Sequence, residues 1–146
     1  MRLVPGTVAY WRELFDGGQS KFVYILGVLD PVDARGNRLP PEVLWFTISS
    51  QTKWTRLDPH CQEMVEIPLG TATYLRQRSF IQCFFEVGRP PLQDFRYLEG
   101  RGYINWRGQL PQFLPQIVEI LERSQLLSVY ETEDALTAIA DERLEA

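Results

Sequence analysis

The sequence has little of what membrane, secreted or disulfide-rich proteins need. No apolar run approaches the roughly 18–20 residues of a membrane span. Residues 1–15 carry charges and Pro5-Gly6 where a signal peptide has an apolar stretch. Two cysteines occur, Cys61 and Cys83, without the spacing of a metal site or a disulfide framework. We therefore expect a soluble, cytoplasmic protein without a membrane partner, in which Cys83 is a small core residue.

Recognisable catalytic and cofactor motifs are also missing. The only histidine is His60, and the sequence contains no HExxH zinc motif, EF-hand loop or dinucleotide-binding fingerprint. Gly17-Gly18 precedes a strand-like apolar run instead of a helix, so we interpret it as a turn and not as a phosphate-binding loop. These absences predict a protein that uses no metal and no cofactor.

The 146 residues have an ordinary globular composition and suit one domain. The net charge of −4 is unevenly distributed: residues 1–130 hold 14 basic and 13 acidic side chains, whereas residues 131–146 hold one basic and six acidic ones. The segment 76–107 holds six arginines against three acids. Such a segment can form a local anion-binding patch, although the overall charge is against indiscriminate nucleic-acid binding. An ordinary surface of mixed charge is the alternative.

Short runs of β-branched and aromatic residues, separated by turn residues, fill most of the chain. They predict strands over 7–11, 22–29, 43–49, 64–69 and 79–87, with a short edge strand over 102–106. A polar loop over 30–42 is long enough to be functional or mobile.

Helical periodicity follows the strands. Apolar residues recur at helical spacing from Leu110 to Leu127, and a second helix is predicted over 133–144 with Thr132 as its N-cap. Because the strands do not alternate with helices, we predict a mainly β fold, a small and partly closed antiparallel barrel with one or two C-terminal helices. The barrel and its closing helix would occupy residues 1–128, and an acidic helix or tail residues 129–146.

A candidate phosphate site lies at one end of the predicted sheet. The period of two in the strand over 43–49 places Phe46 and Ile48 in the core and Thr47 and Ser49 on the other face. Lys21 opens the preceding strand, and the start of one antiparallel strand neighbours the end of the next. A cation beside hydroxyl groups can bind a phosphate and stabilise the charge of an in-line displacement. An ordinary solvated strand end is the alternative.

Five segments carry a family resemblance. They are 5–11, 17–26, 46–51, 75–83, and 108–110 followed by 117–121. In this order they resemble the opening strand, the glycine-rich loop with the second strand, the third strand ending in Thr-Ser, the late strand and the closing helix of the MazF/PemK-like toxin family. The resemblance covers about residues 5–127 and implies an SH3-like barrel.

The resemblance also implies a function. Members are the toxin components of toxin–antitoxin systems: metal-independent endoribonucleases, often homodimers, that an antitoxin protein neutralises. In them the ribose 2′-hydroxyl attacks the adjacent phosphodiester. Thr47 matches the active threonine, with Ser49 and Ser50 as supporting donors. Lys21-Phe22 stands where the family usually has Arg-Pro. Arginine binds phosphate through two hydrogen bonds from its planar guanidinium, whereas lysine offers only a point charge. Both an active and an inactive nuclease are compatible with this exchange.

Single-stranded RNA is the expected substrate, because its splayed bases can stack on aromatic side chains. We take Lys21, Thr47 and Ser49 as candidate catalytic residues. The candidate RNA-binding residues are Trp45, Ser50, Trp54, Arg56, Arg76 and Arg78. Packing in the core or at an interface is the alternative for each tryptophan.

Two other functions stay open. The chain could be a non-catalytic relative that binds another protein, as gyrase-poisoning members of the barrel superfamily do through a C-terminal helix. Lys21 and the acidic helix over 133–144 favour this alternative. The chain could also be a plain interaction module with no toxin role, in which case its expression would leave host growth normal.

Overall fold

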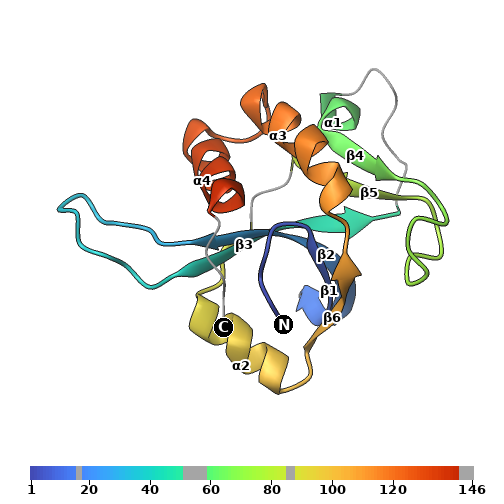
Figure 1. Cartoon of the computed structure of the whole chain (residues 1–146), viewed down its shortest axis with the longest axis horizontal. Coiled ribbons are helices and arrows are strands. Elements are labelled where there is room, and N and C mark those ends of the chain that lie inside the picture. Colours follow the sequence, from blue (N-terminus) through green and yellow to red (C-terminus); the bar gives the residue numbers. More distant parts are fainter. Residues whose placement is uncertain (16–17, 51–58, 85–87, 142–146) are drawn as a thin grey trace.

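An antiparallel sheet forms the centre of the protein (Figure 1). The computed structural model describes residues 1–15, 18–50, 59–84 and 88–141. Along the chain, the elements are β1 (Thr7–Phe15), β2 (Gln19–Leu29), β3 (Glu42–Ser49), α1 (Pro59–Gln62), β4 (Met64–Ile67), β5 (Ser79–Gln82), α2 (Leu92–Gly100), β6 (Ile104–Gln109), the 3₁₀ turn η1 (Pro111–Phe113), α3 (Leu114–Glu122) and α4 (Val129–Ala140).

The strand order is β4-β5-β3-β2-β1-β6, and neighbouring strands are antiparallel. This confirms the predicted mainly β, antiparallel architecture with helices. β4 and β6 are the two edges and do not pair with each other, so the sheet of the described residues is open and is not a closed barrel. The edge strand expected over 102–106 is β6. Among the described residues, no helix is long and apolar enough to cross a bilayer.

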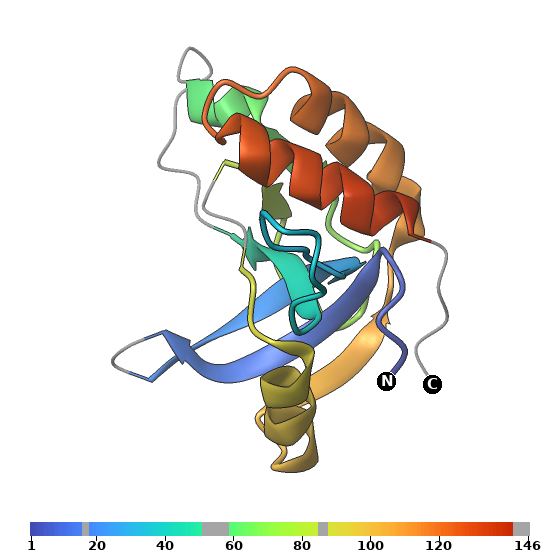
Figure 2. The same cartoon turned by 90° about the vertical axis from the view of Figure 1, so that its left-hand side faces the viewer.

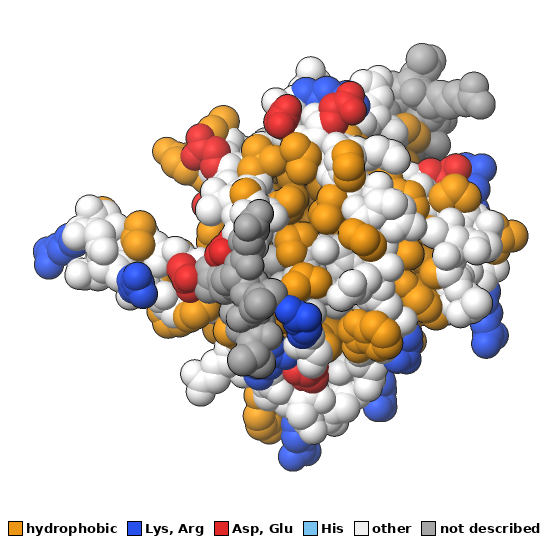
Figure 3. All heavy atoms as spheres, in the orientation of Figure 1, with side chains coloured by type: hydrophobic (Ala, Val, Ile, Leu, Met, Phe, Trp, Pro, Cys, Tyr) orange, Lys and Arg blue, Asp and Glu red, His pale blue; other side chains and the backbone are white. Residues whose placement is uncertain are grey.

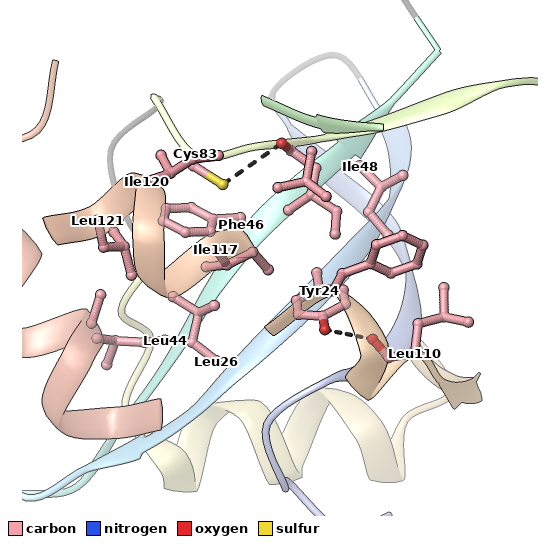
Figure 4. Close-up of a cluster of buried hydrophobic side chains, with 14 of the residues drawn as sticks. Tyr24, Leu26, Leu44, Phe46, Ile48, Cys83, Leu110, Ile117, Ile120 and Leu121 are labelled. Carbon is pink, nitrogen blue, oxygen red and sulfur yellow. Dashed lines mark hydrogen bonds between the residues drawn. The ribbon is translucent and has the colours of Figure 1, made fainter. Parts of the chain in front are cut away.

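Helices cover both faces of the sheet (Figure 2). α3 and α4 cover one face, where the larger hydrophobic core lies (Figure 4). Tyr24 and Phe46 from the sheet meet Ile117 and Leu121 from α3 there. The Tyr24 hydroxyl donates a hydrogen bond of 2.6 Å to the Leu110 carbonyl, which satisfies a buried polar group at the core's edge.

A second core lies on the opposite face, beneath α2. Phe95 is the buried residue of α2, and its ring meets the edge of Trp11 at 5.7 Å between centroids. Ala9, Val23 and Ile104 complete its centre. The alternation of strand side chains therefore supplies two apolar surfaces, so both faces of β1, β2 and β3 are largely buried. The sequence did not predict α2, nor the short α1.

The last helix is part of the globular body. α4 begins at Val129, where Ser128 and Glu131 form a capping box, so the predicted N-cap at Thr132 is wrong. Ala135 and Ala138 are fully buried against the sheet. Gly27 of β2 has a φ of +142°, and a Cβ there would lie 2.5 Å from the Ala138 carbonyl oxygen. This close approach fixes α4 on the sheet.

Candidate functional site

A groove of about 610 Å³ opens at one end of the sheet. Its floor is the start of β2 and the end of β3, which neighbour each other because Phe22 pairs with Ile48. Segment 73–77 and Ser79 contribute from the connection that leads into β5. The predicted meeting of the start of one strand with the end of the next is therefore confirmed, and it creates a concave surface.

Aromatic rings form a continuous row in this groove. Tyr10 and Phe22 are cross-strand partners with ring centroids 4.9 Å apart, and Phe22 lies 5.9 Å from Tyr74. The Arg107 guanidinium lies over the Tyr10 ring at 5.4 Å. Rings and guanidinium planes are the groups on which unpaired nucleobases stack.

The groove is cationic although the whole chain is acidic. Lys21, Arg76 and Arg107 line it, and none of its described lining residues is Asp, Glu or His. Its hydroxyl groups come from Ser20, Ser49, Ser50, Thr73, Tyr74, Ser79 and Tyr10. Three cations among hydroxyl donors without a competing carboxylate suit an anionic ligand with several phosphates.

Tyr74 contributes a polar group that the described residues leave unused. Burial raises the pKa of its phenol, so the hydroxyl is neutral at pH 7 and can donate a hydrogen bond. Its oxygen is buried and has no hydrogen-bond partner among the described residues. The tyrosine therefore brings a ring to the wall of the groove, and its hydroxyl is an unpaired polar group buried behind that wall.

Lys21 and Thr47 leave the sheet on the same face. Val23 pairs with Thr47, and Lys21 lies two positions before Val23, which makes Lys21 and Thr47 diagonal neighbours. Such positions are about 7–8 Å apart. The Thr47 side chain is only 7% exposed, and its hydroxyl donates to Gln82 Oε1 at 3.1 Å. Thr47 is not among the residues that line the groove, whereas Lys21 and Ser49 are.

The other predicted RNA-binding residues lie in different places. Ser50 and Arg76 line the groove. Arg78 does not line it, and its guanidinium pairs with Glu66 at 3.0 Å. Trp45 packs against Trp11, with ring centroids 5.4 Å apart, on the α2 side of the sheet. Trp54 and Arg56 lie outside the described residues.

The lining residues that supply the rings and the second arginine were not predicted from the sequence: Tyr10, Phe22, Tyr74 and Arg107. Tyr10 and Phe22 looked like ordinary strand residues, and Arg107 lies far along the chain from them. The only available signal was the period of two in residues 7–11, which separates Tyr10 from the core residues Ala9 and Trp11.

No family model, curated protein or solved structure shows significant similarity to the chain. The MazF/PemK-like resemblance therefore stays a prediction. Among the described residues, no group of three or more His, Cys, Asp or Glu side chains could hold a metal ion.

Proposed function

We propose that this chain binds single-stranded RNA in the groove and cleaves it without a metal ion, as the toxin component of a toxin–antitoxin system related to SH3-like barrels. The observation that carries the proposal is the row of Tyr10, Phe22 and Tyr74 together with Arg76 and Arg107, in a groove that Lys21 also borders. Aromatic rings suit bases, and cations suit the phosphates between them. Duplex RNA hides its base faces and could not use these rings.

The binding contribution of each group follows from its chemistry. Stacking on an aromatic ring contributes about 1–3 kcal/mol per base and tolerates any base. Arg76 and Arg107 are exposed arginines whose guanidinium forks can bind phosphate through two hydrogen bonds. The hydroxyl groups of the groove can bind phosphate oxygens or the ribose 2′-hydroxyl, which distinguishes RNA from DNA.

The proposed reaction is an intramolecular displacement. The ribose 2′-oxygen forms a bond to the adjacent phosphorus, the bond from phosphorus to the 5′-oxygen breaks, and the proton of the 2′-hydroxyl is transferred to the leaving 5′-oxygen through solvent. The products are a 2′,3′-cyclic phosphate and a 5′-hydroxyl. Lys21 and the two arginines would stabilise the additional negative charge on phosphorus. Thr47, held by Gln82, and Ser49, which is only 6% exposed, would position that strand end.

The test is incubation of the folded protein with a mixed single-stranded RNA, with and without a chelator. We expect cleavage in both samples and 2′,3′-cyclic ends on the products. Replacing one ribose at the cleavage site by deoxyribose should block that cut, because the attacking oxygen is gone. Intact RNA at high protein concentration would refute the nuclease.

Lys21→Met tests the main catalytic assignment. Removal of one charge-stabilising group costs about 10²–10³-fold in rate, so we expect a loss of that size with a preserved melting temperature. Arg101→Met, which removes an exposed arginine after α2, is the matched control and should retain full activity. Equal rates for the Lys21 variant and the wild type would remove Lys21 from the mechanism.

The proposed partner is an antitoxin protein that occupies the same groove. An acidic or extended antitoxin segment would compete with RNA for Lys21, Arg76 and Arg107. Competition between RNA and such a segment for one site on the protein is the expected behaviour, and simultaneous binding of both would contradict it.

Burial of the Thr47 hydroxyl favours a second function, a non-catalytic relative that binds another protein. Under this alternative, induced expression arrests growth while cellular RNA stays intact. Deleting α4 would not test it, because Ala135 and Ala138 belong to the core. Substitution of Val129 and Tyr130, which are exposed at the start of α4, is the appropriate test.

A further inference from the structure

The sheet surface that carries Tyr10 continues beyond the groove toward the start of β6. Tyr10 pairs with Asn105 across β1 and β6, and the backbone N–H of Arg12 donates to the Tyr103 carbonyl at 2.7 Å, which continues the same register. Positions two apart on a strand share a face of the sheet. Arg12 and Tyr103 therefore stand on the face of Tyr10, about 7 Å farther along β1 at about 3.4 Å per residue.

Arg12 and Tyr103 form a stacked pair on this surface. The Arg12 guanidinium lies over the Tyr103 ring at 5.7 Å from its centroid, as the Arg107 guanidinium lies over the Tyr10 ring. Arg12 is exposed, Tyr103 is half-buried, and neither of them lines the groove. We call Arg12 and Tyr103 the outer platform. It repeats the chemistry of the Tyr10–Arg107 pair outside the groove.

No carboxylate among the described residues neutralises the outer platform. Arg12 forms no ion pair with its neighbour Glu13 or with any other described acid. Figure 3 shows basic side chains along the side of the molecule where Figure 1 places β6, and several acidic ones over α3 and α4. The Arg12 guanidinium can therefore bind a phosphate or stack on a base.

Asn105 adds a polar group between the two stacked pairs. It is the cross-strand partner of Tyr10 and lies two positions from Tyr103, so it shares their face of the sheet. Its amide nitrogen donates to the Gly102 carbonyl at 2.9 Å, and its amide oxygen accepts no hydrogen bond from a described residue. A nucleobase that lies between the two pairs can donate an N–H to this oxygen.

We propose that the outer platform is a second subsite for the single-stranded RNA, occupied by nucleotides that leave the groove past Arg107. This inference rests on the proposed RNA binding. The strand would cross β2 and β1 over Phe22 and Tyr10 and continue to the outer platform. One base would stack there on the Arg12 guanidinium, which the Tyr103 ring supports from the other side. Tyr103 is thus a positioning residue for Arg12.

A nucleic acid explains both parts of the outer platform. A single strand presents flat bases joined by phosphates, which matches a row of rings bordered by guanidinium groups from Tyr74 to Arg12. An acidic peptide would match the cations and leave the rings without a flat partner. Single-stranded RNA is therefore the occupant that uses the whole surface.

Binding of RNAs of two lengths tests this subsite. The probes are labelled oligouridylates with 2′-O-methyl riboses, which lack the attacking hydroxyl: a tetranucleotide for the groove and a decanucleotide that can also reach the outer platform. Fluorescence anisotropy at low salt gives both affinities. We expect the wild-type protein to bind the decanucleotide about fivefold or more tightly than the tetranucleotide, because at least one additional base is stacked.

Arg12→Gln with Tyr103→Leu removes the outer platform. We expect this variant to bind the decanucleotide about 5- to 100-fold more weakly than the wild type and the tetranucleotide equally well. Tyr103→Phe keeps the supporting ring and should bind both RNAs like the wild type. Arg12→Gln alone, at an exposed position, gives the same comparison if the double variant unfolds. The matched control is Arg101→Gln with Tyr97→Leu, an exposed pair at α2 that should leave both affinities unchanged.

The outcomes separate this subsite from RNA binding itself. If the wild-type protein binds neither RNA, the groove proposal fails and the subsite fails with it. If the wild type binds both RNAs and the Arg12 variants bind the decanucleotide equally well, only the subsite is overturned. The subsite is also overturned if these variants lose binding of a polyglutamate peptide while their RNA affinities are unchanged, which would assign the platform to an acidic protein.

Discussion

The side chains of Thr47 and Lys21 differ in burial and in hydrogen bonding. Both side chains leave the same face, but Thr47 is buried and donates to Gln82, whereas Lys21 is partly exposed and borders the groove. A buried hydroxyl that already donates a hydrogen bond holds the neighbouring side chain in place. A lysine at a rim keeps a mobile charge for a ligand. Their roles therefore differ although their positions are close.

Thr47→Val measures the structural role of this threonine. Valine preserves the shape and leaves Gln82 Oε1 without its hydroxyl donor, a loss that costs about 1–3 kcal/mol. Urea unfolding should show this decrease in the free energy of unfolding. Thr137→Val, at an exposed position of α4, is the control. Equal stability of the two variants would show that the Thr47–Gln82 bond contributes nothing.

Glu99 gives the stability a dependence on pH. Burial raises the pKa of its carboxyl, but hydrogen bonds and charges from the Met1 ammonium and Arg96 outweigh this effect, and the pKa lies below its ordinary value. Its stabilisation is therefore present at neutral pH and lost as the pH falls through the pKa of the folded state.

Glu99→Gln should lower the free energy of unfolding at neutral pH by less than about 1 kcal/mol, because the pair is partly exposed. The difference from the wild type should shrink as the pH falls through the folded-state pKa of Glu99, below which both chains carry a neutral group. A difference that stays constant between neutral pH and that acidic limit would exclude the carboxylate as its source.

Single residues also show how far the sequence predicts the site. Lys21, Ser49, Ser50 and Arg76 were proposed from type and position, and they line the groove. Arg107 was not proposed as a site residue, because it lies on the edge strand β6. The pairing of β6 with β1 cannot be deduced from local periodicity. The sequence identifies which residues could bind phosphate, while the sheet order decides which ones meet.

At the scale of elements, the helices illustrate two kinds of local signal. Ser128 with Glu131 is a capping box that starts α4 four residues before the predicted helix, and this signal is visible in the sequence. α2 has a short apolar stripe and starts after Pro91 without a side-chain cap. Its formation depends on Phe95 packing beneath the sheet, which is a tertiary contact that no local pattern contains.

Gly27→Ala tests the packing of α4 on β2. The new Cβ would clash with the Ala138 carbonyl, and alanine disfavours a φ of +142°. We expect a loss of about 2–4 kcal/mol in the free energy of unfolding. Gly36→Ala, at a positive φ in the connection between β2 and β3 with open space around it, controls for the backbone strain alone. Equal losses for both would show that α4 does not rest on Gly27.

At the scale of the whole molecule, the strand positions and the antiparallel class were predictable, because the alternation of apolar residues is local. The open sheet with its two cores was not, since it depends on β6 joining β1 and on α2 covering the second face. The same long-range pairing assembles a cationic groove in an acidic chain. Charge totals along the sequence therefore say little about the local surface.

The most direct test of RNA binding is fluorescence anisotropy with a labelled single-stranded RNA under conditions that prevent cleavage, over a range of salt. We predict binding that weakens with salt and an affinity about 10- to 100-fold lower for Arg76→Glu with Arg107→Glu. The control is Arg101→Glu with Arg123→Glu, which has the same net charge and should bind like the wild type. Equal affinities for the groove variant and this control would contradict the assignment of the groove as the RNA site.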